Sequence, residues 1–161
     1  MNGRLAAAAA LIGAAIVILS QVVAAYALEN ELGEVLDTVN LLDKHGALTA
    51  VIGLIAALAL VFAVATGSRP ALVFMTGMGA AVILIFLLVD VPDIGATGMF
   101  TTDTAGNLDA TGKAEPGLWL ELVGGAILVL AGIALMTLSP DQLRAIGPET
   151  TASPRKETKN R

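Results

Sequence analysis

The sequence predicts an all-α membrane protein: a four-transmembrane-helix bundle with an outer amphipathic helix and a short irregular outer lobe. Three observations support this fold class. The chain is 56% hydrophobic, its mean hydropathy is +0.81, and its charged residues, 14% of the total, are confined to stretches between apolar runs. A soluble domain of this size keeps more of its surface polar, so we expect a lipid bilayer to surround most of the molecule.

Four apolar runs are long enough to be membrane spans. A helix needs about 20 apolar residues to cross roughly 30 Å of hydrocarbon. The runs that meet this requirement are residues 5–28, 47–66, 71–89 and 118–138, and none contains an internal proline. Backbone amides in lipid must be satisfied within their own segment, so we predict helices.

Short polar segments predict where the chain turns on the inner side. Residues 67–70, Gly-Ser-Arg-Pro, combine a glycine cap with a serine N-cap and a first-turn proline, which predicts a helical hairpin. Residues 139–142, Ser-Pro-Asp-Gln, form a capping box and predict a short helix over 140–146. Together, residues 1–147 are expected to form the transmembrane domain. Residues 148–161 have almost no apolar side chains, so we expect a disordered basic cytoplasmic tail.

Lysine and arginine are divided unequally between the two ends of the spans. Cytoplasmic flanks carry an excess of these residues. With the N-terminus inside, the outer side holds two of the nine, Lys44 and Lys113. The inner side holds the other seven: Arg4, Arg69, Arg144, Arg155, Lys156, Lys159 and Arg161. Both termini are therefore predicted to be cytoplasmic. The absence of cysteine and of glycosylation acceptors favours a bacterial cytoplasmic (plasma) membrane.

The first apolar run has an alternative interpretation. Residues 1–27 begin with a basic residue, continue as an apolar run and end with Ala25-Tyr26-Ala27, a pattern similar to a cleavable signal peptide. The run exceeds the roughly 7–15 residues usual for such a peptide. A retained transmembrane helix is therefore preferred.

The two longer segments between spans both lie on the outer side. In residues 28–45 the apolar side chains recur at helical spacing opposite an acidic face, which predicts an amphipathic helix capping the bundle. Residues 90–117 are rich in turn-forming residues and predict a short irregular lobe or a hairpin. Asp103, Asn107 and Asp109 resemble a calcium loop, but their spacing does not match an EF-hand, so we expect a solvated turn.

Small residues recur at four-residue and seven-residue spacing within the last three spans. Such stripes let helices approach closely in lipid. They predict a tight bundle and do not distinguish contacts within one chain from contacts between copies. The residues concerned are Gly53 and Ala57, Ala59 and Ala63, Gly77 and Ala81, and Gly125 and Gly132.

Titratable side chains gather at the outer ends of the predicted spans. The candidate functional groups, beside Lys44, are Asp43, His45, Asp90, Asp93 and Glu121. Glu121 is the only acidic or basic side chain within a span, and it lies about one turn from the outer end, where we expect it to reach the interface. His45, the only histidine, is a candidate pH-sensitive element. No metal site and no cofactor are predicted.

Two sequence segments resemble small, uncharacterised bacterial four-span membrane proteins. These are Asp-Val-Pro-Asp at 90–93 and Lys-Ala-Glu-Pro-Gly-Leu-Trp-Leu-Glu-Leu at 113–122. The resemblance covers the helical region and implies no activity. Gly-Leu-Trp at 117–119 is also similar to the claudin tripeptide, but that motif follows the first helix and accompanies two cysteines, both lacking here.

These features favour a non-enzymatic accessory or scaffold subunit that presents an acidic outer surface to a membrane-protein partner. No nucleophile–base pair, phosphate loop or metal-ligand repeat indicates an enzyme, and the net charge of −5 argues against nucleic acid. One alternative is a small transporter or channel built as a homo-oligomer, using Glu121 and the outer carboxylates. Another is a pH or ion sensor acting through His45.

Overall fold

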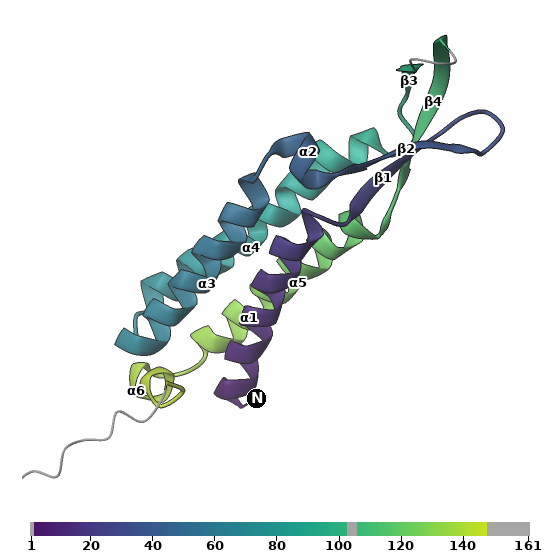
Figure 1. The fold of residues 1–161 in the computed structure, drawn as a ribbon. Coiled ribbons are helices and arrows are strands. Elements are labelled where there is room, and N and C mark those ends of the chain that lie inside the picture. Colours follow the sequence, from purple (N-terminus) through teal and green to yellow (C-terminus); the bar gives the residue numbers. More distant parts are fainter. Residues whose placement is uncertain (1, 103–105, 148–161) are drawn as a thin grey trace, which may run out of the picture.

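The computed structural model describes residues 2–102 and 106–147, with side chains of 100–108 left undescribed. Four long helices pack side by side, and a β-sheet projects from one end of them (Figure 1). The helices are α1 (Gly3–Ser20), α3 (Leu48–Thr66), α4 (Arg69–Ile85) and α5 (Pro116–Met136). Each is long and apolar enough to cross a membrane, α4 together with the turns that continue it to Asp93. Four candidate spans are therefore confirmed.

Each long helix packs against two others, so the four form a closed bundle: α1 contacts α5 and α3, and α4 contacts α5 and α3. Glycines allow the closest approaches. A Cβ on Gly13 would lie 3.0 Å from the carbonyl oxygen of Gly124, and a Cβ on Gly79 would lie 3.0 Å from that of Gly125. These crossings bring backbone against backbone, as expected where packing rather than hydrophobic burial drives association in lipid.

The predicted small-residue stripes are confirmed in part. Gly53, Gly125 and Gly132 all lie in helix–helix contacts. Gly77 does not, because nothing lies within 4 Å of the position that its Cβ would take. Gly77 therefore takes no part in packing within this chain, and Gly79, two residues on, is the α4 glycine that faces α5.

The end of the bundle opposite the sheet, called the inner end after the predicted orientation, follows the sequence prediction closely. Gly67 ends α3 with φ of 72°, in the left-handed region, and the Ser68 side chain caps α4. Ser139 and Gln142 form the predicted capping box at the start of α6 (Pro140–Arg144), which ends two residues before the predicted end. Arg144 then donates a hydrogen bond of 3.1 Å to the carbonyl oxygen of Thr66 at the end of α3. The predicted tail, 148–161, lies outside the described residues.

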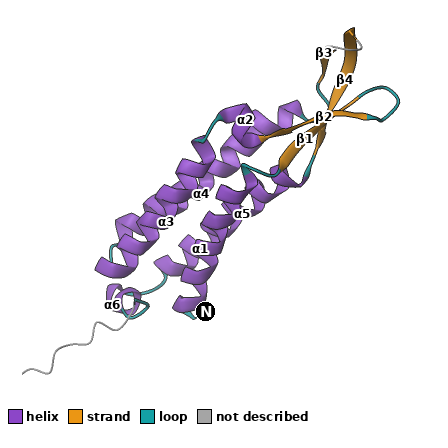
Figure 2. Ribbon diagram, in the orientation of Figure 1, coloured by secondary structure: helices purple, strands orange, loops and turns teal. Residues whose placement is uncertain are grey.

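The outer end differs from the prediction because it contains a four-stranded antiparallel sheet (Figure 2). Its strands are β1 (Ala24–Glu29), β2 (Val35–Asn40), β3 (Thr97–Thr102) and β4 (Gly106–Ala114), in the order β2-β1-β4-β3. The all-α fold class is therefore wrong.

Two predicted elements are corrected by this sheet. The first span ends at Ser20 rather than at residue 28, and the predicted amphipathic helix over 28–45 is a β-hairpin followed by the short helix α2 (Leu41–His45). The pairing that decides this is distant in sequence, since Tyr26 lies opposite Ala114 and Glu29 opposite Thr111. Tertiary pairing here overrides the local helical periodicity.

The second outer segment forms the β3–β4 hairpin, so the hairpin alternative is confirmed and the irregular lobe is wrong. Asp103 of the calcium-like pattern lies outside the described residues. α4 reaches this hairpin through a π-helical turn, η1 (Phe86–Asp90), and a 3₁₀ turn, η2 (Val91–Asp93). Such π turns re-aim side chains within a helix and are frequent at functional sites.

Candidate functional site

A network of polar side chains occupies the junction between the bundle and the sheet. It draws on β1, α2, η1 and η2, which meet above the outer end of α5. A small apolar core lies beside it, made of Ala25, Tyr26, Leu41, Phe86 and Leu118. The network therefore sits where the sheet is attached to the helices.

Asp90 is the centre of this network. It is fully buried at the end of the π-helical turn. Its Oδ1 lies 3.1 Å from the Tyr26 hydroxyl, 3.0 Å from Lys44 Nζ and 2.8 Å from His45 Nε2. Three donors thus converge on one oxygen, while Oδ2 has no hydrogen-bond partner among the described residues.

Lys44 joins Asp90 to Asp93. Its Nζ lies 2.6 Å from Asp93 Oδ2 and donates a 2.9 Å hydrogen bond to the Tyr26 hydroxyl. Burial disfavours the charged ammonium, but the hydrogen bonds to Asp93, Tyr26 and Asp90 outweigh it, so the pKa of Lys44 is raised above its usual value. Lys44 is therefore a fixed positive charge in this network.

Tyr26 reaches the network from β1. Its hydroxyl also lies 3.0 Å from the Asp90 carbonyl oxygen, and Lys44 Nζ lies 4.4 Å from its ring centroid, a cation–π distance. Burial raises the pKa of Tyr26 to about 12, opposed by the hydrogen bond from Lys44 and reinforced by the negative charge of Asp90. The phenol thus stays protonated and ties the sheet to the end of α4.

Glu121 approaches Asp90 from α5. The sequence prediction placed it at the interface, but the structure buries it completely, with 0% of its surface exposed. It faces Asp90 and Thr49. Neither carboxylate oxygen has a hydrogen-bond partner of good geometry among the described residues, and the same holds for the buried Thr49 hydroxyl. The interfacial assignment is therefore wrong.

The structure brings together four of the five predicted site residues. Asp90, Glu121 and His45 are buried or nearly so, and Asp93, with its side chain 51% exposed, closes the outer edge. Asp43 is exposed, and its side chain makes no hydrogen bond or ion pair with the network.

Tyr26 and Thr49 complete the network, and the sequence analysis did not assign either to it. Tyr26 was counted within the first predicted span, residues 5–28. Its place here depends on the β1–β4 pairing, for which the sequence holds no local signal.

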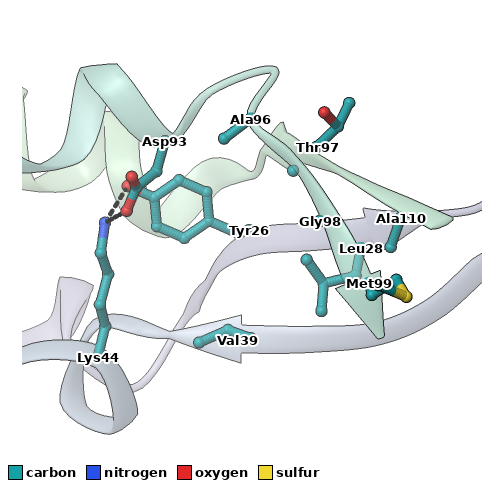
Figure 3. A pocket seen from close by; sticks show the side chains of 11 residues that line it. Tyr26, Leu28, Val39, Lys44, Asp93, Ala96, Thr97, Gly98, Met99 and Ala110 are labelled. Atoms are coloured by element: carbon teal, nitrogen blue, oxygen red, sulfur yellow. Dashed lines mark hydrogen bonds and ion pairs between the residues drawn. The ribbon is translucent and has the colours of Figure 1, made fainter. Parts of the chain in front are cut away.

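A groove opens between the network and one side of the sheet (Figure 3). Its volume is about 380 Å³, and Lys44 and Asp93 form one end. The walls come from all four strands and are mainly apolar. They include Leu28, Val39, Met99 and Ala110.

Fold and site together define a class: a bundle of four helices, each long and apolar enough to span a membrane, that carries a small antiparallel sheet on a buried ionic network. Comparisons with protein families, with curated proteins and with solved structures give no match. Among the described residues no group of three or more histidine or acidic side chains is placed to hold a metal ion. The chemistry that this site supports is charge pairing and proton binding.

Proposed function

We propose that the protein is a non-enzymatic, multi-pass accessory or scaffold subunit of a bacterial cytoplasmic membrane. It holds a β-sheet at the extracytoplasmic surface and presents it to a membrane-protein partner. The observation that carries this proposal is the construction of the sheet. Both outer segments contribute two strands each, and the Tyr26–Asp90–Lys44 contacts fasten the sheet to the helices.

The orientation rests on charge. The sheet and α2 contain the only two basic residues assigned to the outer side, whereas α6 and the α3–α4 turn carry arginines. This places the sheet outside and both termini in the cytoplasm.

The face that such a partner would meet is acidic. The β1–β2 hairpin and α2 expose four carboxylates: Glu31, Glu34, Asp37 and Asp43. The Asn30 side chain accepts hydrogen bonds from the backbone of Leu32 and Glu34, which fixes the turn. A preorganised acidic hairpin matches a partner with basic side chains, because complementary charge favours encounter and orientation.

A transporter or channel is the second candidate, and the buried Glu121 favours it, because carboxylates inside a bundle commonly belong to proton or ion paths. The rest of the bundle core argues against a path within one copy. Towards the inner end it is packed with alanine, leucine, valine and methionine side chains, including Leu60, Leu72, Met75 and Leu128. Transport would therefore need a pathway between copies.

Single cysteines test this proposal, since the natural chain has none. We expect Glu31→Cys, in the β1–β2 turn, to react in intact cells with a membrane-impermeant maleimide cross-linker and to give one discrete adduct with a second protein. The matched control is Asp141→Cys, an exposed acidic position on α6, which should react only after permeabilisation. Labelling of Asp141→Cys in intact cells would show that the protein has the opposite orientation. An adduct that contains only this chain would favour the homo-oligomeric transporter.

A further inference from the structure

The buried network contains more carboxylates than cations. Asp90, Asp93 and Glu121 supply three acidic groups, and Lys44 is the one fixed positive charge among them. His45 adds a second only when both its ring nitrogens are protonated, and it already contacts Asp90 Oδ1. Asp93 is half exposed and satisfied by Lys44. The unbalanced charge therefore falls on the Asp90–Glu121 pair.

Unpartnered oxygens meet at this pair. Asp90 Oδ2, both Glu121 oxygens and the Thr49 hydroxyl are buried without a hydrogen bond among the described residues. Leaving a buried acceptor unpaired is unfavourable, and more so for a charged group. Two ionised carboxylates side by side in such a place also repel each other strongly.

One proton resolves both problems. Glu121 faces Asp90 and Thr49. Once protonated, it carries an O–H that can donate to the Asp90 carboxylate, and its other oxygen can accept from the Thr49 hydroxyl. Every other charged or titratable group that faces the pair from a neighbouring element is already engaged. Lys44 and His45 of α2 and Tyr26 of β1 all contact Asp90 Oδ1, on the opposite side of that carboxylate.

We propose that Asp90 and Glu121 form a binding site for one exchangeable proton, which locks the outer sheet to the helical bundle. The proton comes from the outer aqueous phase and returns to it along the half-exposed Asp93 and Lys44 edge. This inference does not depend on the proposed partner. The pH dependence of stability then comes from the carboxylate pair, and His45 is a neighbour that contacts Asp90.

Loss of the proton has a structural consequence. Asp90 ends the turn that leads into β3, and Glu121 lies in the second turn of α5, which follows directly on β4. The two carboxylates thus stand on the segments that enter and leave the β3–β4 hairpin. If both ionise, their repulsion pushes the end of α4 away from the start of α5. Loss of the shared proton therefore weakens the attachment of the sheet to the bundle, and stability should fall as the pH rises.

The test uses the full-length protein in detergent micelles, with thermal unfolding followed by circular dichroism between about pH 5 and about pH 9. We expect the Tm of the parent to fall by about 5 °C or more across this range. Glu121→Gln keeps a hydrogen-bond donor that cannot ionise, so its Tm should vary little over the same range. Asp93→Asn, at the exposed end of the same network, is the matched control and should keep the parent's pH dependence.

Infrared spectroscopy provides a second readout that does not depend on unfolding. The parent should show the C=O stretch of a protonated carboxylic acid at neutral pH, and Glu121→Gln should lack it. A parent without this band, or a band that persists in Glu121→Gln, would overturn the proposal. A Tm that rises with Na⁺ at constant ionic strength, in a parent without the band, would assign the site to a metal cation instead.

Discussion

The two ends of the helical bundle are built on different principles. At the inner end, short turns and apolar side chains meet in a core dominated by alanine and leucine, including Ala63, Leu135 and Leu143. At the outer end, buried charged groups and a sheet replace that core. The inner end gains stability from packing and has no buried charged side chain to satisfy among the described residues. The outer end depends on each polar group finding its partner, since a half-satisfied buried network is costly.

The two ends should therefore differ in how their stability responds to pH. Packed apolar contacts change little with pH or ionic conditions. A buried network of two carboxylates, a lysine and a tyrosine changes its free energy whenever one proton is gained or lost. We therefore expect substitutions at the outer end to alter stability in a pH-dependent way, and substitutions in the apolar core to alter it equally at every pH.

Removing Asp90 should have the largest effect. Asp90→Ala leaves His45 without its buried acceptor, leaves the Tyr26 hydroxyl with only the backbone carbonyl oxygen of position 90, and deprives Lys44 of one of its two carboxylates. Breaking a buried charge pair by removing one partner typically costs about 3–5 kcal/mol. The free energy of unfolding, measured in micelles by denaturant titration, should fall by that amount.

The matched control is Asp93→Ala, which removes the other carboxylate of Lys44. The Asp93 side chain is 51% exposed. Exposed ion pairs contribute about 1 kcal/mol or less. Equal losses of unfolding free energy in Asp90→Ala and Asp93→Ala would mean that burial does not make the Asp90 contacts stronger than those of Asp93.

The titration of Tyr26 sharpens the comparison, because this is the only tyrosine in the chain. Burial should shift its ionisation, seen by ultraviolet absorbance, to a pKa of about 12, against about 10 in the denatured chain. A raised pKa means that the folded state holds the phenolic proton more tightly. Its contribution to stability is complete below about pH 10 and is lost as the pH rises towards about 12.

Substitution of Asp90 provides the check on cause. The negative charge of Asp90 disfavours the phenolate. Asp90→Asn should therefore lower the Tyr26 pKa. A Tyr26 that ionises near its ordinary value in the folded parent would show that β1 does not bury it against the network.

The sequence predicted the inner end well because the signals there are local. Four apolar runs, the glycine at position 67 and the Ser139–Gln142 capping box each decide their own structure within a few residues. The outer end was mispredicted because its structure depends on contacts between distant residues. Nothing near Tyr26 in the sequence indicates that it pairs with Ala114. The apolar residues of 28–45 recur at helical spacing although the segment forms strands.

The candidate site shows the same division. Charged residues at the ends of spans were enough to predict that His45, Asp90, Asp93 and Glu121 come together. Their roles were not predictable, because the depth of Glu121 depends on how the sheet closes over the end of α5. A residue one turn from the end of a helix is expected to reach water only where no other element covers that end.

The apolar bundle offers the smallest of the expected effects, and two glycines on neighbouring helices test it. A Cβ on Gly125 of α5 would lie 3.1 Å from side-chain carbons of Val82 and Ile83 on α4. Gly125→Leu should therefore force α4 and α5 apart and lower the free energy of unfolding by about 1–3 kcal/mol. Gly77→Leu on α4 is the matched control, because no atom lies within 4 Å of its Cβ position, and its stability should equal that of the parent. Both measurements should give the same difference at about pH 5 and about pH 9, because the atoms nearest the Gly125 Cβ position belong to Val82, Ile83 and Gly79, none of which titrates. A pH-dependent loss in Gly125→Leu would show that the bundle and the junction network do not act as separate regions.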